Sequence, residues 1–338
     1  MLLTIRKFKT SMVESRFTPI VFALFAITLR LVMFLSLGIE QQQYPTSFIW
    51  HLIAPLVSNS WISLSMSTIS IFIIAFILSQ LNLNFNLIRF RTALPFSMLV
   101  FFLSIHPAFL PMSPNYISAI LILLSLFPLL QSYQHPSPRN FAFKSGVLIA
   151  MAATFQVYSL VFLPIWLYGE TSMHNFRIKS FIALILGVIL VLWNVAGFYF
   201  IFDRLHSFIE PFVYFKNIIE SIPAFSISQW ISITLLILIS GVYLMLDYQF
   251  FSRERVLTQK TLSFINLIVI CSFVLHFLYL KQTNFFMCLI VILMSFIVAH
   301  YYSHTKNKWQ VYSFIFLLVG SFLFYINFTI GNPLQLLP

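Results

Sequence analysis

The sequence predicts an all-α protein, a polytopic bundle of transmembrane helices with about ten membrane segments, one of them a re-entrant or broken pair. The composition is the first reason, because 60% of the 338 residues are hydrophobic and the mean hydropathy is +0.95. The second reason is that only 8% of the residues are charged, whereas a soluble domain carries about 25%. The third is that the apolar residues fall in runs of about 20, which is the length that crosses the hydrocarbon layer as a helix.

The long apolar runs give the expected membrane helices in chain order. Irregular backbone is not tolerated against lipid, so we expect each run to be helical. The clear candidates are 17–38, 60–81, 92–111, 115–131, 180–202, 229–247, 262–280, 284–302 and 310–330. The first is too long for a signal-peptide core and no small-residue cleavage site follows it, so we interpret it as a retained helix. The segment 46–57 is too short to span, and its Trp50 favours a helix lying flat at the surface.

One further run, 143–168, is longer than usual, and the basic residues decide how we interpret it. If it enters and leaves the membrane on one side, 15 of the 19 Lys and Arg residues fall on the side of the N-terminus and three on the other. If it crosses once, every later segment changes side and this bias disappears. The positive-inside rule therefore predicts a broken pair of half-helices, with the break in 154–159. It also places the N-terminus in the cytoplasm.

The chain carries no linker or obvious repeat, so we expect one membrane domain over 1–338. The longest stretch between runs, 203–228, is nearly balanced in charge and is expected to be an outer loop against the membrane. The net charge of +11 would indicate nucleic acid in a soluble protein. In this chain the basic residues lie between apolar runs, so the positive charge is explained by the orientation of the protein across the membrane, and we expect no nucleic-acid partner. Cys271 and Cys288 lie inside apolar runs and are expected to be core residues, neither a disulfide nor a metal pair.

Arg30 is the most informative single residue, because it lies inside the first apolar run. A charge in the hydrocarbon region costs at least about 2.5 kcal/mol, so it should face protein or water. We expect Glu40 or a lipid phosphate as its partner, and snorkelling to the outer headgroups is an equal alternative. Glu40 lies alone in the first outer loop. A carboxylate there suits a general base, but a solvated loop residue is the commoner interpretation.

The histidines carry a weaker signal. Those inside or bordering apolar runs are His51, His106, His276 and His300. The sequence has no P-loop, dinucleotide fingerprint, nucleophile elbow or zinc motif, and we expect no bound metal. A proton relay needs an acid or a second histidine inside the bilayer. Asp247 lies at the end of a run beside the basic segment 248–260, so the sequence disfavours a proton-coupled transporter.

With its segments placed, the chain resembles the N-terminal half of GT-C-type polytopic glycosyltransferases. The likeness begins with a first helix that starts at Ser15-Arg16-Phe17 and contains Arg30, followed by an outer loop with an acid and a surface helix. The stretch Leu81-Asn82-Leu83-Asn84-Phe85 then leads into Arg89-Phe90-Arg91-Thr92-Ala93-Leu94-Pro95. A helical hairpin around His106-Pro107-Ala108 and a re-entrant segment from about Phe143 complete the pattern. The stretch from Arg91 to Phe200 is also similar to a family of Bacteroidota inner-membrane proteins known only as a domain of unknown function.

The resemblance implies a GT-C-like core over 17–202, followed by C-terminal helices over 229–330. It implies sugar transfer at the outer membrane face from a polyprenyl-phosphate-linked donor, and no other cofactor is evident. Glu40 would be the catalytic base, and the lipid-phosphate or substrate contacts would be Arg30, His51 and Arg204. GT-C enzymes usually place an acidic catalytic base in the first outer loop, often as a close acidic pair. Only Glu40 is present here, so the sequence leaves open whether the chain is an enzyme.

Three hypotheses of function follow. The one we rank first is a degenerate GT-C-like scaffold, a non-catalytic subunit in envelope biogenesis whose partners are membrane lipid and other envelope proteins. The second is a small GT-C glycosyltransferase that uses a polyprenyl-phosphate sugar. The third is a lipid or solute transporter, which would need polar groups at mid-membrane and is often built from inverted repeats.

Overall fold

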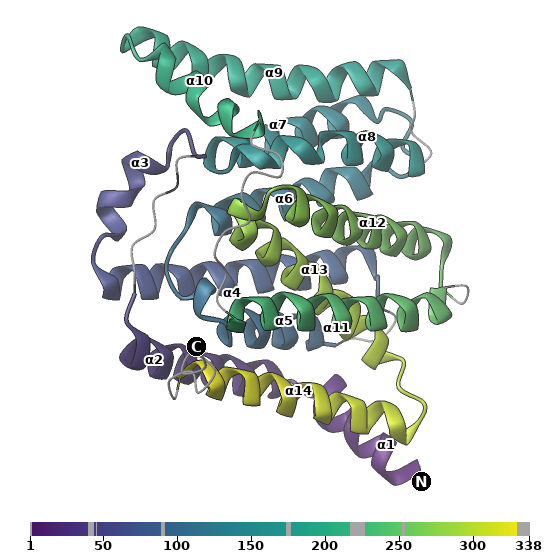
Figure 1. Ribbon diagram of the computed structural model, residues 1–338. Coiled ribbons are helices and arrows are strands. Elements are labelled where there is room, and N and C mark those ends of the chain that lie inside the picture. The colour runs from purple at the N-terminus through teal and green to yellow at the C-terminus, as the bar shows by residue number, and fades with distance from the viewer. Residues whose placement is uncertain are drawn as a thin grey trace.

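The computed structural model describes residues 2–39, 44, 46–88, 92–173, 177–216, 227–251 and 254–329. These residues form a bundle of α-helices without a β-strand, which confirms the predicted all-α polytopic fold (Figure 1). Within the described ranges, eight helices are long and apolar enough to cross a membrane. The protein is therefore a multi-pass membrane protein.

The helices follow the predicted runs closely. In chain order they are α1 (Leu2–Phe8), α2 (Thr18–Leu37), α3 (Trp50–Ile53), α4 (Ser60–Phe85), α5 (Leu94–Ser104), α6 (Pro114–Gln131), α7 (Arg139–Phe155), α8 (Leu163–Ser172), α9 (Ile178–Ile201), α10 (Leu205–Val213), α11 (Ile227–Phe251), α12 (Val256–Leu278), α13 (Thr283–Ser303) and α14 (Lys308–Thr329). Short helical turns join them, namely η1 (Lys9–Val13), η2 (Ala54–Val57), η3 (Pro107–Phe109), η4 (Val157–Phe162), η5 (Tyr214–Lys216) and η6 (Leu280–Gln282).

Polar residues and prolines set several of these boundaries. Asn59 precedes α4, and its Oδ1 accepts a hydrogen bond from the Trp61 backbone N–H at 2.9 Å, which satisfies one free donor of the first turn. The same helix ends where Asn86 takes the left-handed conformation, with φ of 47°. The predicted helix 92–111 is shorter than expected, since α5 ends at Ser104 and Pro107 begins the separate turn η3.

The long helices lie side by side with their axes roughly along one direction (Figure 1). We call the end of the bundle that holds α1 the N-side end, and the opposite end, where α2 finishes, the far end. Helix α13 lies at the centre, packed against α5, α11 and α12, and its membrane-length segment is buried all round. By contrast, large apolar side chains on the outer helices face outward, such as Trp193, exposed by 76%, and Phe316, exposed by 79%. Lipid is the solvent that suits such a surface.

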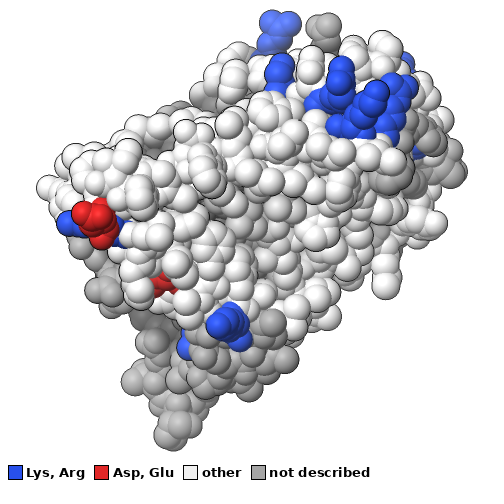
Figure 2. Space-filling model, turned by 90° about the horizontal axis from the view of Figure 1, so that it is seen from above, with Lys and Arg blue, Asp and Glu red and all other residues white. Residues whose placement is uncertain are grey.

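Charged side chains gather at the two ends of the bundle. Figure 2 shows a broad white belt without Lys, Arg, Asp or Glu between a group of basic residues at the N-side end and mixed charges at the far end. This arrangement agrees with the sequence-based placement of most basic residues on the side of the N-terminus. The exposed Asp203 and Arg204 follow α9 at the far end.

The predicted break inside 143–168 is present. Helix α7 stops at Phe155, Gln156 is extended, η4 follows, and α8 then returns toward the N-side end. Both ends of the pair lie on one side of the bundle, because Arg177 Nη1 donates to Pro136 O at 2.9 Å and Lys260 Nζ donates to Ser172 O at 2.8 Å. The pair therefore enters and leaves on the same side, as the charge bias predicts.

Protein groups satisfy the irregular backbone and side chain at this break. The Gln156 side chain accepts from Thr46 Oγ1 at 2.5 Å and donates to Asn115 Oδ1 at 3.2 Å and Gln282 Oε1 at 3.1 Å. The Val157 backbone N–H donates to Thr46 O at 3.0 Å. Thr46 and Gln282 lie in far-end connections and Asn115 lies in the first turn of α6, so the apex of the hairpin reaches the far end of the bundle. Helix α7, with 17 residues, spans about 25 Å, most of the hydrocarbon thickness.

Small residues let α7 and α9 approach closely. A Cβ atom added to Gly146 would lie 2.1 Å from Leu184 O, and one added to Gly187 would lie 2.5 Å from Phe143 O. Close backbone contact of this kind is a common way for membrane helices to associate.

The remaining local predictions can be placed as follows. The segment 46–57 contains the short helix α3 and the turn η2, with Leu56 exposed and Trp50 buried. Cys271 and Cys288 are free thiols. The outer loop 203–228 begins with α10 and η5, and its later part lies outside the described residues.

Candidate metal centre

Arg30 lies inside the protein and is 2% exposed. Its Nε donates to Thr68 Oγ1 at 2.9 Å and its Nη1 to Phe109 O at 2.9 Å. Its Nη2 donates to Ser67 Oγ at 2.5 Å and to Leu110 O at 3.0 Å. The guanidinium therefore ties α2 to α4 and to the turn η3, and none of these acceptors is a carboxylate.

The other residues predicted for an outer site do not join Arg30 in the described structure. Glu40 lies outside the described residues. His51 on α3 and Arg204 after α9 are exposed, and no described hydrogen bond or ion pair links either of them to Arg30. Arg204 donates its backbone N–H to Tyr199 O at 2.9 Å.

Tyr44 is the nearest described residue on the C-terminal side of Glu40. Its ring packs edge-on against Trp50, with ring centroids 6.0 Å apart. Burial raises the pKa of Tyr44 to about 12, and a hydrogen bond with Ser113 lowers it slightly. The phenol is therefore neutral at physiological pH and adds no charge to the outer loop.

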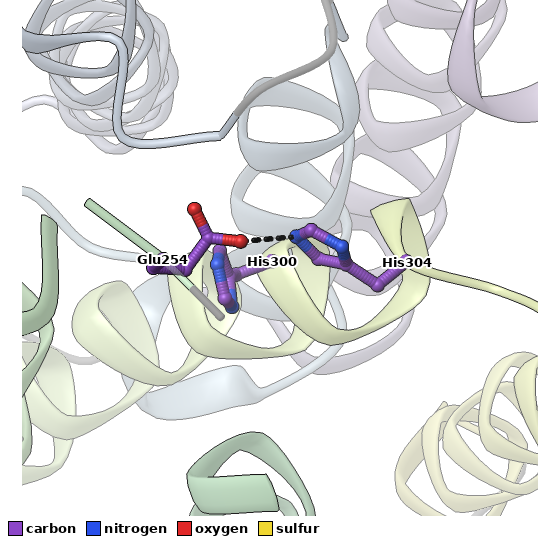
Figure 3. A group of neighbouring side chains, drawn as sticks. All are labelled: Glu254, His300 and His304. Atoms are coloured by element: carbon purple, nitrogen blue, oxygen red, sulfur yellow. Dashed lines mark ion pairs between the residues drawn. The ribbon is translucent and has the colours of Figure 1, made fainter. Parts of the chain in front are cut away.

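The N-side end of the bundle holds a different group of titratable side chains. Glu254, His300 and His304 offer three possible metal ligands whose donor atoms all lie within 4.8 Å of one another (Figure 3). Asp247 on α11 contacts His300 from behind this group. Two carboxylates and two imidazoles thus meet where the ends of α11, α12 and α13 come together.

The helices bring these residues together for simple geometric reasons. His300 and His304 are four positions apart at the end of α13, so they lie on one face of the helix. Helix α11 packs against α13 and runs in the same direction, so Asp247 near the end of α11 lies beside His300 near the end of α13. The short connection from α11 to α12 then places Glu254 beside the ring of His304.

The contact between Asp247 and His300 determines which nitrogen is available. Asp247 Oδ1 lies 2.5 Å from His300 Nδ1, and both side chains are fully buried. An ionised carboxylate only accepts hydrogen bonds, so the shared proton lies on Nδ1 and the lone pair of the neutral ring lies on Nε2. His300 Nε2 is buried and has no hydrogen-bond partner among the described residues. Metal-bound histidines have this arrangement, with the second nitrogen donating to a carboxylate.

His304 and Glu254 complete the donor set. His304 Nε2 lies 3.4 Å from Glu254 Oε1, and the ring of His304 stacks on Phe250 with centroids 5.6 Å apart. The side chain of Glu254 is buried, while that of His304 is 12% exposed. Two imidazole nitrogens and one carboxylate oxygen are ligands that Zn²⁺ prefers, with the fourth position left for water or another ligand.

A metal ion would draw these ligands closer together. Ligand atoms at 2.0–2.1 Å from a tetrahedral ion are about 3.3 Å apart. The donor atoms are up to 4.8 Å apart, so the side chains would have to close by about 1.5 Å. The alternative is two metal-free histidine–carboxylate pairs. That alternative leaves His300 Nε2 buried without a partner, which costs about 1–3 kcal/mol, and a metal ion removes this cost.

From the sequence we named His300 and Asp247 separately and did not name Glu254 or His304 at all. The available signal was the four-residue spacing of His300 and His304 at the end of an apolar run. Asp247, which the sequence places at the end of an apolar run and far from His300, contacts His300 in the structure.

Comparison with known proteins adds no assignment. The chain matches no protein-family model, no curated protein and no solved structure. The resemblance to GT-C glycosyltransferases and to the Bacteroidota family therefore stays a prediction.

Proposed function

We propose that this multi-pass membrane protein binds one divalent transition-metal ion, for which Zn²⁺ is the best fit, through Glu254, His300 and His304. The orientation of His300 is the observation that carries the proposal. Asp247 occupies Nδ1 of His300, so Nε2, which has no partner among the described residues, is the nitrogen that His300 has left for an ion shared with Glu254 and His304. A role limited to packing explains the contact between Asp247 and His300, but it does not explain why the buried Nε2 of His300 has no partner among the described residues.

The donor set also indicates what the ion would do. Structural zinc sites use four protein ligands, whereas catalytic sites use three and keep one position for water or substrate. Zinc in such a site supplies a Lewis acid and a water of lowered pKa. The partial exposure of His304 gives the site access from the N-side end. A metal-dependent reaction on a small polar substrate at that membrane surface is therefore the activity class that we propose.

Metal content and affinity test this proposal directly. We expect the full chain, purified in mild detergent, to bind one Zn²⁺ per chain in a calorimetric titration. His300→Ala and His304→Ala should each weaken binding at least tenfold. His51→Ala is the matched control, because His51 is exposed on α3 at the far end, and it should bind as the wild type does. Equal affinity in all four proteins would refute the proposal.

The second candidate function is the GT-C-like scaffold predicted from the sequence, acting as a non-catalytic subunit in envelope biogenesis. The hydrogen bonds of Arg30 favour this form over the glycosyltransferase. A cation that anchors a leaving phosphate must turn donors toward the substrate, whereas four described contacts of Arg30 are made to α4 and to the chain around η3. Affinity purification in mild detergent tests it, and a chain that never retains a partner protein would contradict it.

A further inference from the structure

A second feature of the structure opens at the far end, opposite the metal centre. A groove runs between α5, α11, α13 and α14. Its floor is the central helix α13, from Met287 to Val298, and its walls include Leu235 on α11 and Phe324 on α14. The lining is almost entirely apolar.

The groove continues into a polar mouth. A second pocket of about 750 Å³ shares His106, Ser232 and Met287 with it and adds Lys281 and Asn284 from the connection between α12 and α13. Lys281 is the charged residue among the described residues that line the two pockets. The combined cavity is therefore amphipathic, with a long apolar slot and a cationic opening at the end of the bundle.

The length of the slot matches one leaflet of a bilayer. Met287 and Val298 are 11 positions apart on one helix, which is about 16 Å along its axis. Half of the ~30 Å hydrocarbon layer is about 15 Å. The slot is therefore about as long as one acyl chain in a leaflet, and its inner end at Val298 lies 15 positions, about 22 Å, from the start of α13 at Thr283.

Two polar side chains that line the cavity, Ser240 and His106, could contact a bound ligand. Ser240 is 1% exposed, and its Oγ has no hydrogen-bond partner in the described part of the chain although it lines the slot. His106 Nδ1 accepts the Ala108 backbone N–H at 3.1 Å, so the ring proton lies on Nε2, a donor for an acceptor in the mouth. The mouth therefore combines a cation with a hydrogen-bond donor.

We propose that this groove binds one anionic phospholipid from the leaflet at the far end. One acyl chain lies along α13, and the phosphate lies between Lys281 and His106. A cationic mouth selects an anionic headgroup, and an apolar slot of one-leaflet length selects a chain rather than a folded partner. The proposal uses none of the metal ligands: the mouth lies at the end opposite the metal centre, and the slot lining on α13 ends at Val298, two residues before His300.

The experiment uses the full chain, purified in mild detergent and observed by native mass spectrometry with added phosphatidylglycerol or phosphatidylethanolamine. We expect one phosphatidylglycerol per chain and at least fivefold preference over phosphatidylethanolamine. Lys281→Gln should remove the preference. Lys306→Gln is the matched control, since Lys306 is exposed at the N-side end, and it should keep the preference.

A photoactivatable acyl chain gives a second measurement that does not depend on a variant. Phosphatidylglycerol with a diazirine on one chain should crosslink to the peptide of α13 that spans Met287–Val298, which is otherwise buried. Crosslinks confined to the exposed faces of α2 and α9 would overturn the proposal. So would the same preference for phosphatidylglycerol in Lys281→Gln as in the wild type, or a dimer of the chain without bound lipid.

Discussion

Replacing Asp247 with asparagine tests the metal centre through a residue that is not itself a ligand. Asp247 Oδ1 lies 2.5 Å from His300 Nδ1 and both groups are buried, so the carboxylate fixes the ring orientation and tautomer of His300. An asparagine of nearly equal size removes the negative charge, and its amide can donate to Nδ1 and move the ring proton to Nε2. Metal binding through Nε2 of His300 then requires the ring proton to return to Nδ1.

The expected loss of zinc affinity follows from what is known of carboxylates that hydrogen-bond to metal-bound histidines. Loss of a carboxylate behind a metal-bound histidine costs 10–100-fold in metal affinity, which is about 1.4–2.7 kcal/mol. We expect Asp247→Asn to raise the Kd for Zn²⁺ by this factor in a calorimetric titration at constant pH. The thermal unfolding midpoint without metal should change much less than the midpoint with saturating Zn²⁺.

The control is Asp203→Asn, an exposed carboxylate at the far end, which should leave the Kd unchanged. If Asp247→Asn binds Zn²⁺ as tightly as the wild type, then the contact between Asp247 and His300 does not prepare a metal ligand. The site would then be two histidine–carboxylate pairs that only hold helices together.

Three further predictions concern the fold. Arg30→Met removes the hydrogen bonds that tie α2 to α4 and to the chain around η3, while Tyr116 and Ser67 still donate to the Phe109 and Leu110 carbonyl groups, so the free energy of unfolding in detergent should fall by about 1–3 kcal/mol; an unchanged unfolding midpoint would contradict a structural role. Gly146→Ala should lower the unfolding midpoint strongly because its Cβ would meet a backbone carbonyl at 2.1 Å, whereas Gly197→Ala, with nothing within 4 Å, should not lower it. In intact cells, with native cysteines replaced, an impermeant thiol reagent should label Asp203→Cys but not Asn307→Cys; the reverse pattern would invert the proposed orientation.

Most of the fold could be predicted because lipid leaves the chain few choices. The run 284–302 became α13, Thr283–Ser303, since a continuous apolar segment in a bilayer must be helical. The break at Gln156 could be predicted because basic residues record the side of each loop. The early end of α5 was missed. Its following backbone is irregular, and two of its carbonyl groups accept from Arg30, whose position 79 and 80 residues earlier gives no local signal.

The candidate site was harder to predict because its parts come from α11, from the connection to α12 and from the end of α13. Asp247 and His300 are 53 positions apart, and their contact depends on how α11 packs against α13. Glu254 lies in a basic connection that resembles an ordinary loop. Only the spacing of His300 and His304 is local. That spacing predicts a shared helix face, but the acids that complete the site become visible only in three dimensions.

Extended X-ray absorption at the zinc edge, on the full chain loaded with one equivalent of Zn²⁺, tests the metal centre most directly. We predict nitrogen and oxygen ligands at about 2.0–2.1 Å, with the outer-shell scattering of two imidazole rings. His300→Ala should reduce this to one ring. A spectrum with sulfur at about 2.3 Å, or one without imidazole scattering, would contradict the assignment of Glu254, His300 and His304 as ligands.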